Sequence, residues 1–526
     1  MTGGQIVAHT LQELGADTIY SVSGNQILSV YDAAKDAHLR IIHMRQESAA
    51  AYAAGASAEL SERPGVVLVT AGPGFLAATI GVATVKSMEL PLLFLSGASA
   101  TSDAGAGGFQ DLDQGGVARV TCKATMQISS VQGIRKILTN AWWLAQSSVP
   151  GPVHVSLPSD VLDAVSSEMP CGREESPSAE PAVCDESTLS AMAQKLIEAK
   201  RPLIIARQSA NRGGAGKALH RLARRLGIRP IITESPRGLS DLKTREIVSR
   251  FHDSDCVLAV CPADFAVGFL TEPVFACSAS ILHIDAPGDP RPRRADLHTQ
   301  VPPDIALLYL AEATTRHEPR LASWGRLWSF SQTNGKSPES SPDGLHPLEV
   351  ARQVRGLLEP DDVLILDGGE FCQWIRLGLC DLPNRMLWNS KLGGIGGSIP
   401  MAIGIAATGH RGRTIIFIGD GSFGYHASEF ETAVRHALPI VVIVGNDGRW
   451  GAEWHLQVSR YGPDRTYATD LLAARYDQVA SGLGAMGYHV TDSASLHEAL
   501  VASLSRRQQV CLNVQILSRH SPAAAP

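Results

Sequence analysis

The chain has 526 residues, of which 44% are hydrophobic and 19% are charged, so it is long enough for about three globular domains. Its net charge of −6 and pI near 6.3 give no electrostatic reason to expect a nucleic acid or an anionic membrane as partner. No apolar run approaches the roughly 18 residues of a membrane span, and the first residues lack the pattern of a signal peptide. We therefore expect a cytoplasmic protein whose nine scattered cysteines are reduced thiols.

The first third of the chain predicts alternating helices and strands. Residues 6–14 have the apolar spacing of an amphipathic helix, and Glu47 opens an alanine-rich helix. Short β-branched and apolar segments predict buried strands at residues 18–22, 41–44, 66–70, 92–96 and 153–157. This alternation favours a doubly wound parallel sheet over residues 1–168.

Two polar stretches divide the remainder of the chain. Residues 169–186 are rich in Pro, Ser and Glu and are predicted to be a linker, and a second polar stretch covers about 333–344. Between them, a second α/β unit is expected over residues 187–330. The third domain is expected over residues 345–526, and we expect its last residues, 518–526, to be a short disordered tail.

The segment from Thr414 to Gly451 carries the most specific pattern. Two apolar strands flank a helical segment, and Asp420 and Asn446 each follow a strand. Neighbouring parallel strands end at one edge of the sheet, where α/β proteins bind ligands. Carboxylate and amide oxygens suit Mg²⁺, and the amino end of the helix favours an anion. The pattern therefore predicts a metal and diphosphate site, whereas a lone Asp420 at this turn would indicate only a solvated loop.

These motifs, together with three α/β units of similar size, resemble the thiamine diphosphate (ThDP)-dependent enzymes, a family that includes acetolactate synthase, benzaldehyde lyase and 2-hydroxyacyl-CoA lyase. The resemblance covers essentially the whole chain. It implies three doubly wound parallel-sheet domains: a pyrimidine-binding domain (1–168), a middle domain without catalytic residues (187–330) and a diphosphate-binding domain (345–526). It also implies ThDP and Mg²⁺ as cofactors. A homodimer is the expected minimum, because in the family each site combines two subunits, and a homotetramer is the expected assembly.

The resemblance assigns the activating carboxyl group to Glu47. In the family this group hydrogen-bonds the aminopyrimidine and drives the tautomer change that activates the cofactor, and burial would raise its pKa to suit proton sharing. Taken alone, Glu47 is more typical of a helix amino terminus, where the helix dipole favours a carboxylate; the metal motif reverses this preference. The metal ligands implied are Asp420, Asn446 and the backbone carbonyl of Gly448.

Glycine-flanked loops match the family segments that hold the cofactor. Ile395 would be the apolar wedge between the two rings, and the Gly393 carbonyl would accept the 4′-amino group. Relatives often have a histidine at the position of Phe371. The resemblance therefore implies only a contact between the cofactor and the backbone of Phe371, not one with its side chain. The implied cofactor contacts are Glu47, Gly72, Glu370, Phe371, Gly393, Ile395, Gly419, Gly421, Ser422, Asn446 and Trp450.

Substrate-facing positions follow from the same resemblance. Gln110 would lie near the thiazolium, and Asn25 and Gln26 occupy positions that face the substrate in benzaldehyde lyase. Glu453 is an acid/base candidate. For Gln110 and Glu453 the simple alternative is a solvated loop residue, and for Glu453 this alternative is the favoured one. No His-His pair lies near Gln110, which argues against a plain 2-keto-acid decarboxylase.

The predicted activity is a ThDP- and Mg²⁺-dependent C–C bond lyase or carboligase acting on 2-keto acids, aldehydes or 2-hydroxy ketones. One alternative is a 2-hydroxyacyl-CoA lyase or an oxalyl-CoA decarboxylase, and another is a non-catalytic ThDP-binding regulatory paralogue. In the middle domain, Arg207-Gln208-Ser209 stand where relatives carry a glycine cluster. This argues against flavin or CoA there, although Arg207 and Arg212 could still meet an anion.

Overall fold

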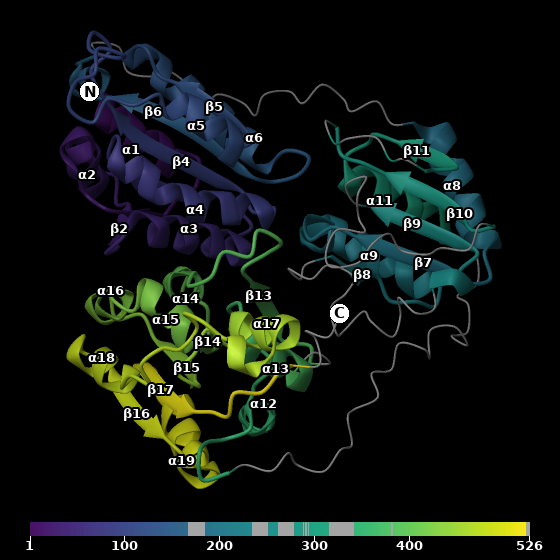
Figure 1. Ribbon diagram of the computed structural model, residues 1–526. Coiled ribbons are helices and arrows are strands. Elements are labelled where there is room, and N and C mark those ends of the chain that lie inside the picture. Colours follow the sequence, from purple (N-terminus) through teal and green to yellow (C-terminus); the bar gives the residue numbers. More distant parts are fainter. Residues whose placement is uncertain are drawn as a thin grey trace. The chain divides into compact units, whose positions relative to one another are not determined.

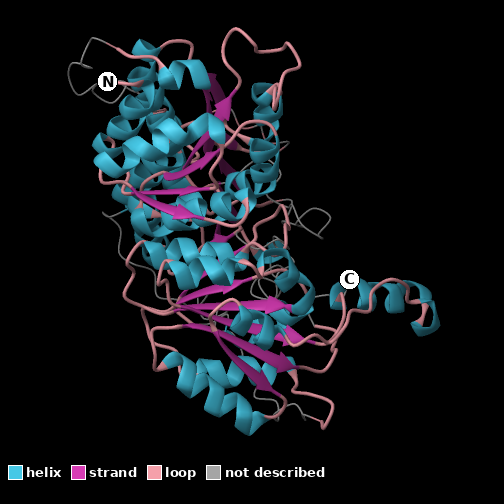
Figure 2. Cartoon of the chain, turned by 90° about the vertical axis from the view of Figure 1, so that its left-hand side faces the viewer, coloured by secondary structure: helices cyan, strands magenta, loops and turns pink. Residues whose placement is uncertain are grey.

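The computed structural model describes residues 1–166, 185–233, 251–260, 278–287, 289, 292, 294–314, 341–379 and 382–521. It contains three β-sheets in which every neighbouring pair of strands is parallel. Helices pack on the faces of these sheets (Figure 1, Figure 2). The predicted fold class, three doubly wound parallel-sheet α/β domains, is confirmed.

The first sheet has six strands in the order β2-β1-β3-β4-β6-β5. The strands are β1 (Thr18–Ser21), β2 (Arg40–His43), β3 (Gly65–Val69), β4 (Leu92–Ala98), β5 (Ala124–Gln127) and β6 (Pro152–Pro158). The helices are α1 (Gly3–Glu13), α2 (Leu28–Asp36), α3 (Glu47–Ser61), α4 (Pro73–Ser87), α5 (Gln114–Thr121), α6 (Ile134–Gln146) and α7 (Ser159–Asp163).

The third sheet repeats this topology, in the order β13-β12-β14-β15-β17-β16. The strands are β12 (Val363–Leu366), β13 (Arg385–Trp388), β14 (Thr414–Gly419), β15 (Ile440–Asn446), β16 (Met486–Val490) and β17 (Gln509–Gln515). The helices are α12 (Pro347–Arg355), α13 (Glu370–Leu379), α14 (Ser398–Ala407), α15 (Asp420–His426), α16 (Glu429–Arg435), α17 (Gly451–Tyr461), α18 (Tyr476–Gly482) and α19 (Ser493–Leu504).

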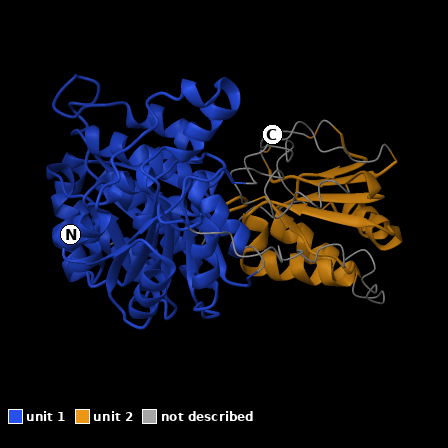
Figure 3. Ribbon diagram, turned by 60° about the horizontal axis from the view of Figure 1, so that its bottom comes forward, with its two compact units in different colours: residues 1–146, 151–174, 335–525 blue, residues 147–150, 175–334, 526 orange. Residues whose placement is uncertain are grey.

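The middle sheet has five strands in the order β11-β10-β9-β7-β8. The strands are β7 (Pro202–Ala206), β8 (Ile231–Ile232), β9 (Cys256–Val260), β10 (Ser280–Ile284) and β11 (Leu297–Thr299), and the helices with described bounds are α8 (Glu186–Glu198), α9 (Gly213–Arg225) and α11 (Pro303–Ala313). This sheet lies in one compact unit, and the first and third sheets together form the other (Figure 3).

The first and third sheets share one continuous hydrophobic core. It contains the alanines of α3 together with Ile399, Ile403 and Ile405 of α14. The two helices touch so closely that a Cβ on Gly404 would lie 2.0 Å from the carbonyl oxygen of Ala53. Small residues on α3 are therefore required by its position, because larger side chains would separate the helix from its neighbours.

Two local predictions need correction. The single helix expected after Gly421 is two short helices, α15 and α16, separated at Ala427 and Ser428. The disordered tail expected from Ser518 is wrong for its described part, since Ser521 is buried and its N–H donates to Glu370 at 2.8 Å. Composition suggested disorder, but backbone hydrogen bonds hold these residues.

The expectations on the linker, the cysteines and a membrane span can also be compared with the structure. The linker predicted at 169–186 falls almost entirely outside the described residues, and the exact domain boundaries remain predictions. The described cysteines, Cys122, Cys256, Cys372 and Cys511, are free and buried. Within the described part of the chain, no helix is long and apolar enough to cross a membrane.

The packing of α3 on β3 predicts the effect of one substitution. A Cβ on Gly65 would lie 1.9 Å from the carbonyl oxygen of Ala54, so Gly65→Ala should lower the free energy of unfolding by at least about 1–3 kcal/mol through overpacking. Urea denaturation measures this loss. Gly482→Ala is the control, because a Cβ there meets no atom within 4 Å, and equal stability of the two variants would contradict the packing described.

Candidate active site

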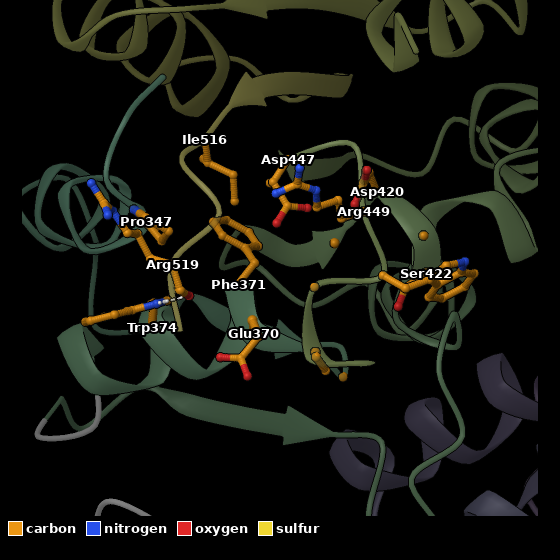
Figure 4. Close-up of a pocket in the computed structure, with 18 of the residues that line it drawn as sticks. Pro347, Glu370, Phe371, Trp374, Asp420, Ser422, Asp447, Arg449, Ile516 and Arg519 are labelled. Carbon is orange, nitrogen blue, oxygen red and sulfur yellow. Dashed lines mark hydrogen bonds between the residues drawn. The ribbon is translucent and has the colours of Figure 1, made fainter. Parts of the chain in front are cut away.

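A cavity of about 100 Å³ lies at the carboxyl ends of β12, β14 and β15. This is the edge where the chain reverses its direction of travel along the sheet and where α/β proteins bind ligands. Figure 4 shows most of its wall. The lining residues that the sequence singled out are Glu370, Phe371, Ile395, Gly419, Asp420, Gly421, Ser422, Trp450 and Glu453.

Asp420 is the most unusual group in the cavity wall. Its side chain is 2% exposed, and its Oδ2 atom has no hydrogen-bond partner among the described residues. Burial, with the nearby Asp447 carboxylate, raises the pKa of Asp420 to about 7, although backbone N–H groups of Gly421 and Arg449 oppose the shift. A buried carboxylate oxygen without a donor is costly, so this position is suited to a cation.

Asp447 joins Asp420 in lining the cavity, and the sequence analysis gave it no role. Burial raises the pKa of Asp447, while the Ser518 hydroxyl and the Arg449 guanidinium act in the opposite direction. Figure 4 shows Asp420, Asp447 and Arg449 close together. The signal was present in the sequence as the residue after Asn446, but only folding shows that its side chain reaches the cavity.

Asn446 and Gly448 do not line the cavity among the described residues. The Asn446 amide group donates to the Ala474 carbonyl at 2.9 Å and to Asn513 Oδ1 at 3.1 Å, and its Oδ1 accepts from the Gly448 N–H at 3.2 Å. The Gly448 carbonyl accepts from the Leu471 N–H at 2.6 Å. Both residues are thus held rigidly beside Asp447.

The glycine-rich loop before α14 is fixed by Asp367, a second residue that sequence reasoning did not assign. Its carboxylate accepts from the N–H groups of Gly396 at 2.9 Å and Ser398 at 3.2 Å. The loop thereby presents Ile395 to the cavity. Gly393 has a φ of 70° and is exposed outside the cavity wall.

The remaining wall is formed by close backbone approaches. A Cβ on Gly445 would lie 2.4 Å from the Phe371 ring, and one on Gly421 would lie 2.7 Å from the Trp450 indole. Both glycines are therefore required for these rings to lie where they do. Glu370 is 8% exposed and bonds the Ser521 N–H rather than pointing freely into solvent, whereas Glu453 is exposed at the rim.

Glu47 is the first residue of α3 in the first domain. It is half-buried, and burial raises its pKa. A Cβ on Gly74 would lie 3.5 Å from Glu47 Oε1, which places the carboxyl group next to the start of α4. The carboxyl group therefore holds its proton more tightly than an exposed glutamate does.

Two residues of the third domain hold the start of α3, and sequence reasoning missed both. His426 Nδ1 lies 2.6 Å from the Gly396 carbonyl, and its Nε2 lies 2.9 Å from Ser48 Oγ. The buried Glu429 carboxylate accepts from the Arg45 N–H at 3.0 Å. These contacts link the segment around Glu47 to the glycine-rich loop. The sequence pattern around Glu429 indicates only a helix, so it could not predict that the Glu429 carboxylate contacts the backbone of the first domain.

Two of the expected substrate-side residues, Gln26 and Gln110, come together at the carboxyl edge of the first sheet. Gln26 Nε2 donates to Gln110 Oε1 at 2.7 Å, and the Thr70 hydroxyl donates to Gln26. Gly72 lies directly against Gln110, since a Cβ there would be 3.0 Å from the Gln110 carbonyl oxygen. Asn25 is exposed.

In the middle domain, Arg207 follows β7 directly and is 5% exposed. Its Nη1 forms an ion pair with Asp289 Oδ2 at 2.6 Å. The guanidinium is thus already neutralised inside the protein. Arg212 precedes α9 as its N-cap residue.

Comparison with known proteins agrees with this architecture. The family described as "Thiamine pyrophosphate enzyme, N-terminal TPP binding domain" matches residues 1–117, and "Thiamine pyrophosphate enzyme, C-terminal TPP binding domain" matches residues 367–514. The chain is 28% identical to a "Probable acetolactate synthase" of Mycobacterium bovis, covering 98% of this chain and 95% of that protein. It is 26% identical to the "Acetolactate synthase" of Bacillus subtilis (98% and 93%) and 28% identical to "2-hydroxyacyl-CoA lyase 2" of Danio rerio (98% and 91%).

The two matched ranges together span half of the chain. The first contains β1 to β4 of the first sheet, and the second lies within the domain of the third sheet. The chain belongs to the thiamine diphosphate-dependent enzymes. With acetolactate synthases and 2-hydroxyacyl-CoA lyases as relatives over nearly its full length, it is a ThDP-dependent carboligase or lyase that acts on small molecules. The family resemblance seen in the sequence is thus confirmed.

The buried Asp420 predicts a pH dependence of stability in the ligand-free protein. Its pKa is about 7 in the folded state and about 4 in an unfolded chain, so the folded state binds the proton more tightly. The free energy of unfolding should therefore fall as pH rises from about 4 to about 7. Asp420→Asn should remove this component, which is of the order of a few kcal/mol.

Urea denaturation at pH 5 and pH 8 measures the effect. Asp464→Asn is the control, because Asp464 is exposed and should leave the difference between the two pH values unchanged. An unaltered difference in Asp420→Asn would show that this carboxyl group is not perturbed.

Proposed function

We propose that this enzyme uses ThDP and Mg²⁺ to make or break the C–C bond next to the carbonyl group of a 2-keto acid, an aldehyde or a 2-hydroxy ketone. The observation that carries the proposal is the cavity at the carboxyl edge of the third sheet, in which a buried Asp420 oxygen has no donor among the described residues. The acetolactate synthases among the relatives support this substrate class.

The acidic side of the cavity fits a divalent cation. Asp420 and Asp447 supply two buried or half-buried carboxyl groups, and a cation would relieve the unfavourable burial of both. In the proposal, Mg²⁺ is held by Asp420, by the Asn446 amide oxygen and by the Gly448 carbonyl. Asp447 supports the site electrostatically.

The remaining wall fits a diphosphate-bearing cofactor. The glycines at 419 and 421 leave backbone accessible, and Ser422, Glu370, Phe371 and Trp450 complete the wall. Ile395 is an apolar side chain on a loop fixed by Asp367, as a wedge between two rings requires. When bound, ThDP supplies a carbon nucleophile and an electron sink for carbonyl chemistry.

Glu47 is proposed to hold the proton that activates the cofactor's aminopyrimidine. Its raised pKa favours a carboxyl group that shares a proton with a ring nitrogen. The contacts of Ser48 with His426 and of Arg45 with Glu429 support a fixed position for this side chain. A regulatory paralogue would not require an activating carboxyl group here, so this reading is disfavoured.

The substrate is proposed to meet the amide groups of Gln110 and Gln26. Their mutual hydrogen bond leaves the Gln110 NH₂ group available to donate to a carbonyl or hydroxyl oxygen. Asn25 and Glu453 are exposed and are proposed to act as further contacts from the rim, with Glu453 as an acid or base.

The second candidate function is a 2-hydroxyacyl-CoA lyase, favoured by the Danio rerio relative. The Arg207–Asp289 ion pair argues against it, because this arginine is already neutralised at the end of β7. We further propose that the protein forms a homodimer or a homotetramer. We also propose a cytoplasmic location, which is supported by the free, buried cysteines among the described residues. Sedimentation of active enzyme as a monomer would contradict the assembly.

Glu47→Ala tests the activation step. The variant should bind ThDP with a Kd within a few-fold of the wild type, measured by titration calorimetry, yet lose at least about 100-fold in kcat, because a positioned proton-transfer group contributes about 10²–10⁴-fold. Glu62→Ala, at the exposed end of the same helix, should behave like the wild type. A near-normal kcat for Glu47→Ala would contradict the assignment of Glu47 as the activating carboxyl group.

The substrate class can be tested directly with ThDP- and Mg²⁺-loaded protein. Pyruvate should be consumed to a carboligation product seen by NMR, and EDTA treatment should abolish turnover, since the cation anchors the diphosphate. No acyl-CoA should bind in titrations. Binding and cleavage of a 2-hydroxyacyl-CoA, with pyruvate untouched, would replace the first proposal with the second.

A further inference from the structure

A chain of buried polar groups runs beneath the contact between Gly72 and Gln110. It begins at Gln114, the first residue of α5, which is 4% exposed. Gln114 Oε1 accepts from the Gly72 N–H at 3.1 Å, while Nε2 donates to the Gly97 carbonyl at 3.0 Å and to Ser96 Oγ at 3.1 Å. Every hydrogen-bonding atom of this amide therefore has a partner within the first domain.

The orientation of the Gln114 side-chain amide is fixed by its backbone partners. A backbone N–H can only donate and a carbonyl can only accept, so Gly72 and Gly97 fix which end of the Gln114 amide faces each of them. Ser96 Oγ, which accepts from Gln114, forms a further hydrogen bond with His154 Nε2, 2.8 Å away.

The chain ends at Thr125. His154 is fully buried, and burial lowers its pKa to about 4, so the ring is neutral at physiological pH. The Nδ1 atom of the ring forms a hydrogen bond with Thr125 Oγ1 at 2.8 Å, so both ring nitrogens have a partner. A fully satisfied buried network of this kind rigidifies the groups at its end.

At the Gln114 end, the chain holds an unusual pair of backbone segments, at Gly72 and Gln110. Gly72 has a φ of 57° and Gln110 a φ of 60°, so both residues lie in the region that side chains disfavour. They are in contact, because a Cβ on Gly72 would lie 3.0 Å from both Cβ and the carbonyl oxygen of Gln110. Such conformations persist only where the surroundings impose them.

We propose that Gln114 is a positioning residue for the reaction. It fixes Gly72 by accepting its N–H, and Gly72 in turn fixes the backbone of Gln110, so that the Gln110 amide keeps one orientation toward the substrate. The inference rests on the proposed function for the substrate-facing role of Gln110. The anchoring of Gly72 does not depend on that role and is tested separately.

The anchoring is tested by amide hydrogen exchange in the cofactor-free protein. Gln114→Met keeps the length of the side chain and removes its three hydrogen bonds, so peptides containing Gly72 and Gln110 should exchange at least about tenfold faster. Gln146→Met is the matched control, because Gln146 lies in the same domain and, among the described residues, its side chain donates only to the Trp142 carbonyl of its own helix. Unchanged exchange in folded Gln114→Met would overturn the proposal.

The positioning role is tested by kinetics on the loaded enzyme. Gln114→Met should raise KM for the substrate about tenfold while the Kd for ThDP stays within a few-fold of the wild type. Gln110→Ala should have a similar effect, and the double variant should be no worse than Gln110→Ala alone, because both act through one group. Additive losses would overturn the positioning role.

The conservative variant Gln114→Glu tests the hydrogen bonds themselves, because a purely structural role of Gln114 would not make KM depend on pH. In Gln114→Glu, only the protonated carboxyl group can donate to the Gly97 carbonyl or Ser96, so KM should recover toward the wild-type value as pH falls. Gln114→Met should show no such recovery, and a flat pH profile for both variants would overturn the proposal. If Gln110→Ala alone leaves the kinetics unchanged, the substrate role of Gln110 fails, while the exchange experiment still decides whether Gln114 anchors Gly72.

Discussion

The close packing of α3 is the constraint on which the rest of this molecule depends. The helix lies in a core shared by the first and third sheets, and its neighbours approach so closely that Gly404 and Gly65 have no space for a side chain. Since Glu47 is the first residue of this helix, the same packing that stabilises two domains also sets the position of the carboxyl group. His426 and Glu429 fix the adjoining backbone, so the segment around Glu47 and the glycine-rich loop that carries Ile395 are held together.

Two carboxyl groups whose charge is left unbalanced lie at the edge of the third sheet, among the described residues. Asp420 and Asp447 lie together at the cavity, and burial raises the pKa of both. Proteins rarely keep such a pair unless a ligand compensates it. The ligand-free fold therefore carries an electrostatic cost, and the cation of the proposed function would remove it and so stabilise this part of the chain.

The substrate side is organised differently, by neutral hydrogen bonds. Gln26, Gln110 and Gln114 each use an amide group whose partners are fixed, and the chain through Ser96 and His154 reaches the interior of the first domain. Charges would be expensive this deep in the sheet, whereas a chain of neutral groups can hold a strained backbone in place. The two proposed parts of the site, for the cofactor and for the substrate, thus differ physically: buried charge dominates the first and neutral hydrogen bonds dominate the second.

The sequence by itself determined the alternation of strands and helices, the three sheets and the residues at the ends of β14 and β15, because hydrophobic periodicity and glycine-bounded polar clusters are local signals. It also indicated Glu47, Ile395 and Gln110, but only through family resemblance. Tertiary structure alone decided the roles of Asp447, Asp367, His426 and Gln114, since each acts on a residue brought near by folding and has no periodic signature. The carboxyl-terminal residues make the same point: their composition indicated disorder, yet the buried Glu370 and its bond to the Ser521 N–H hold them in place.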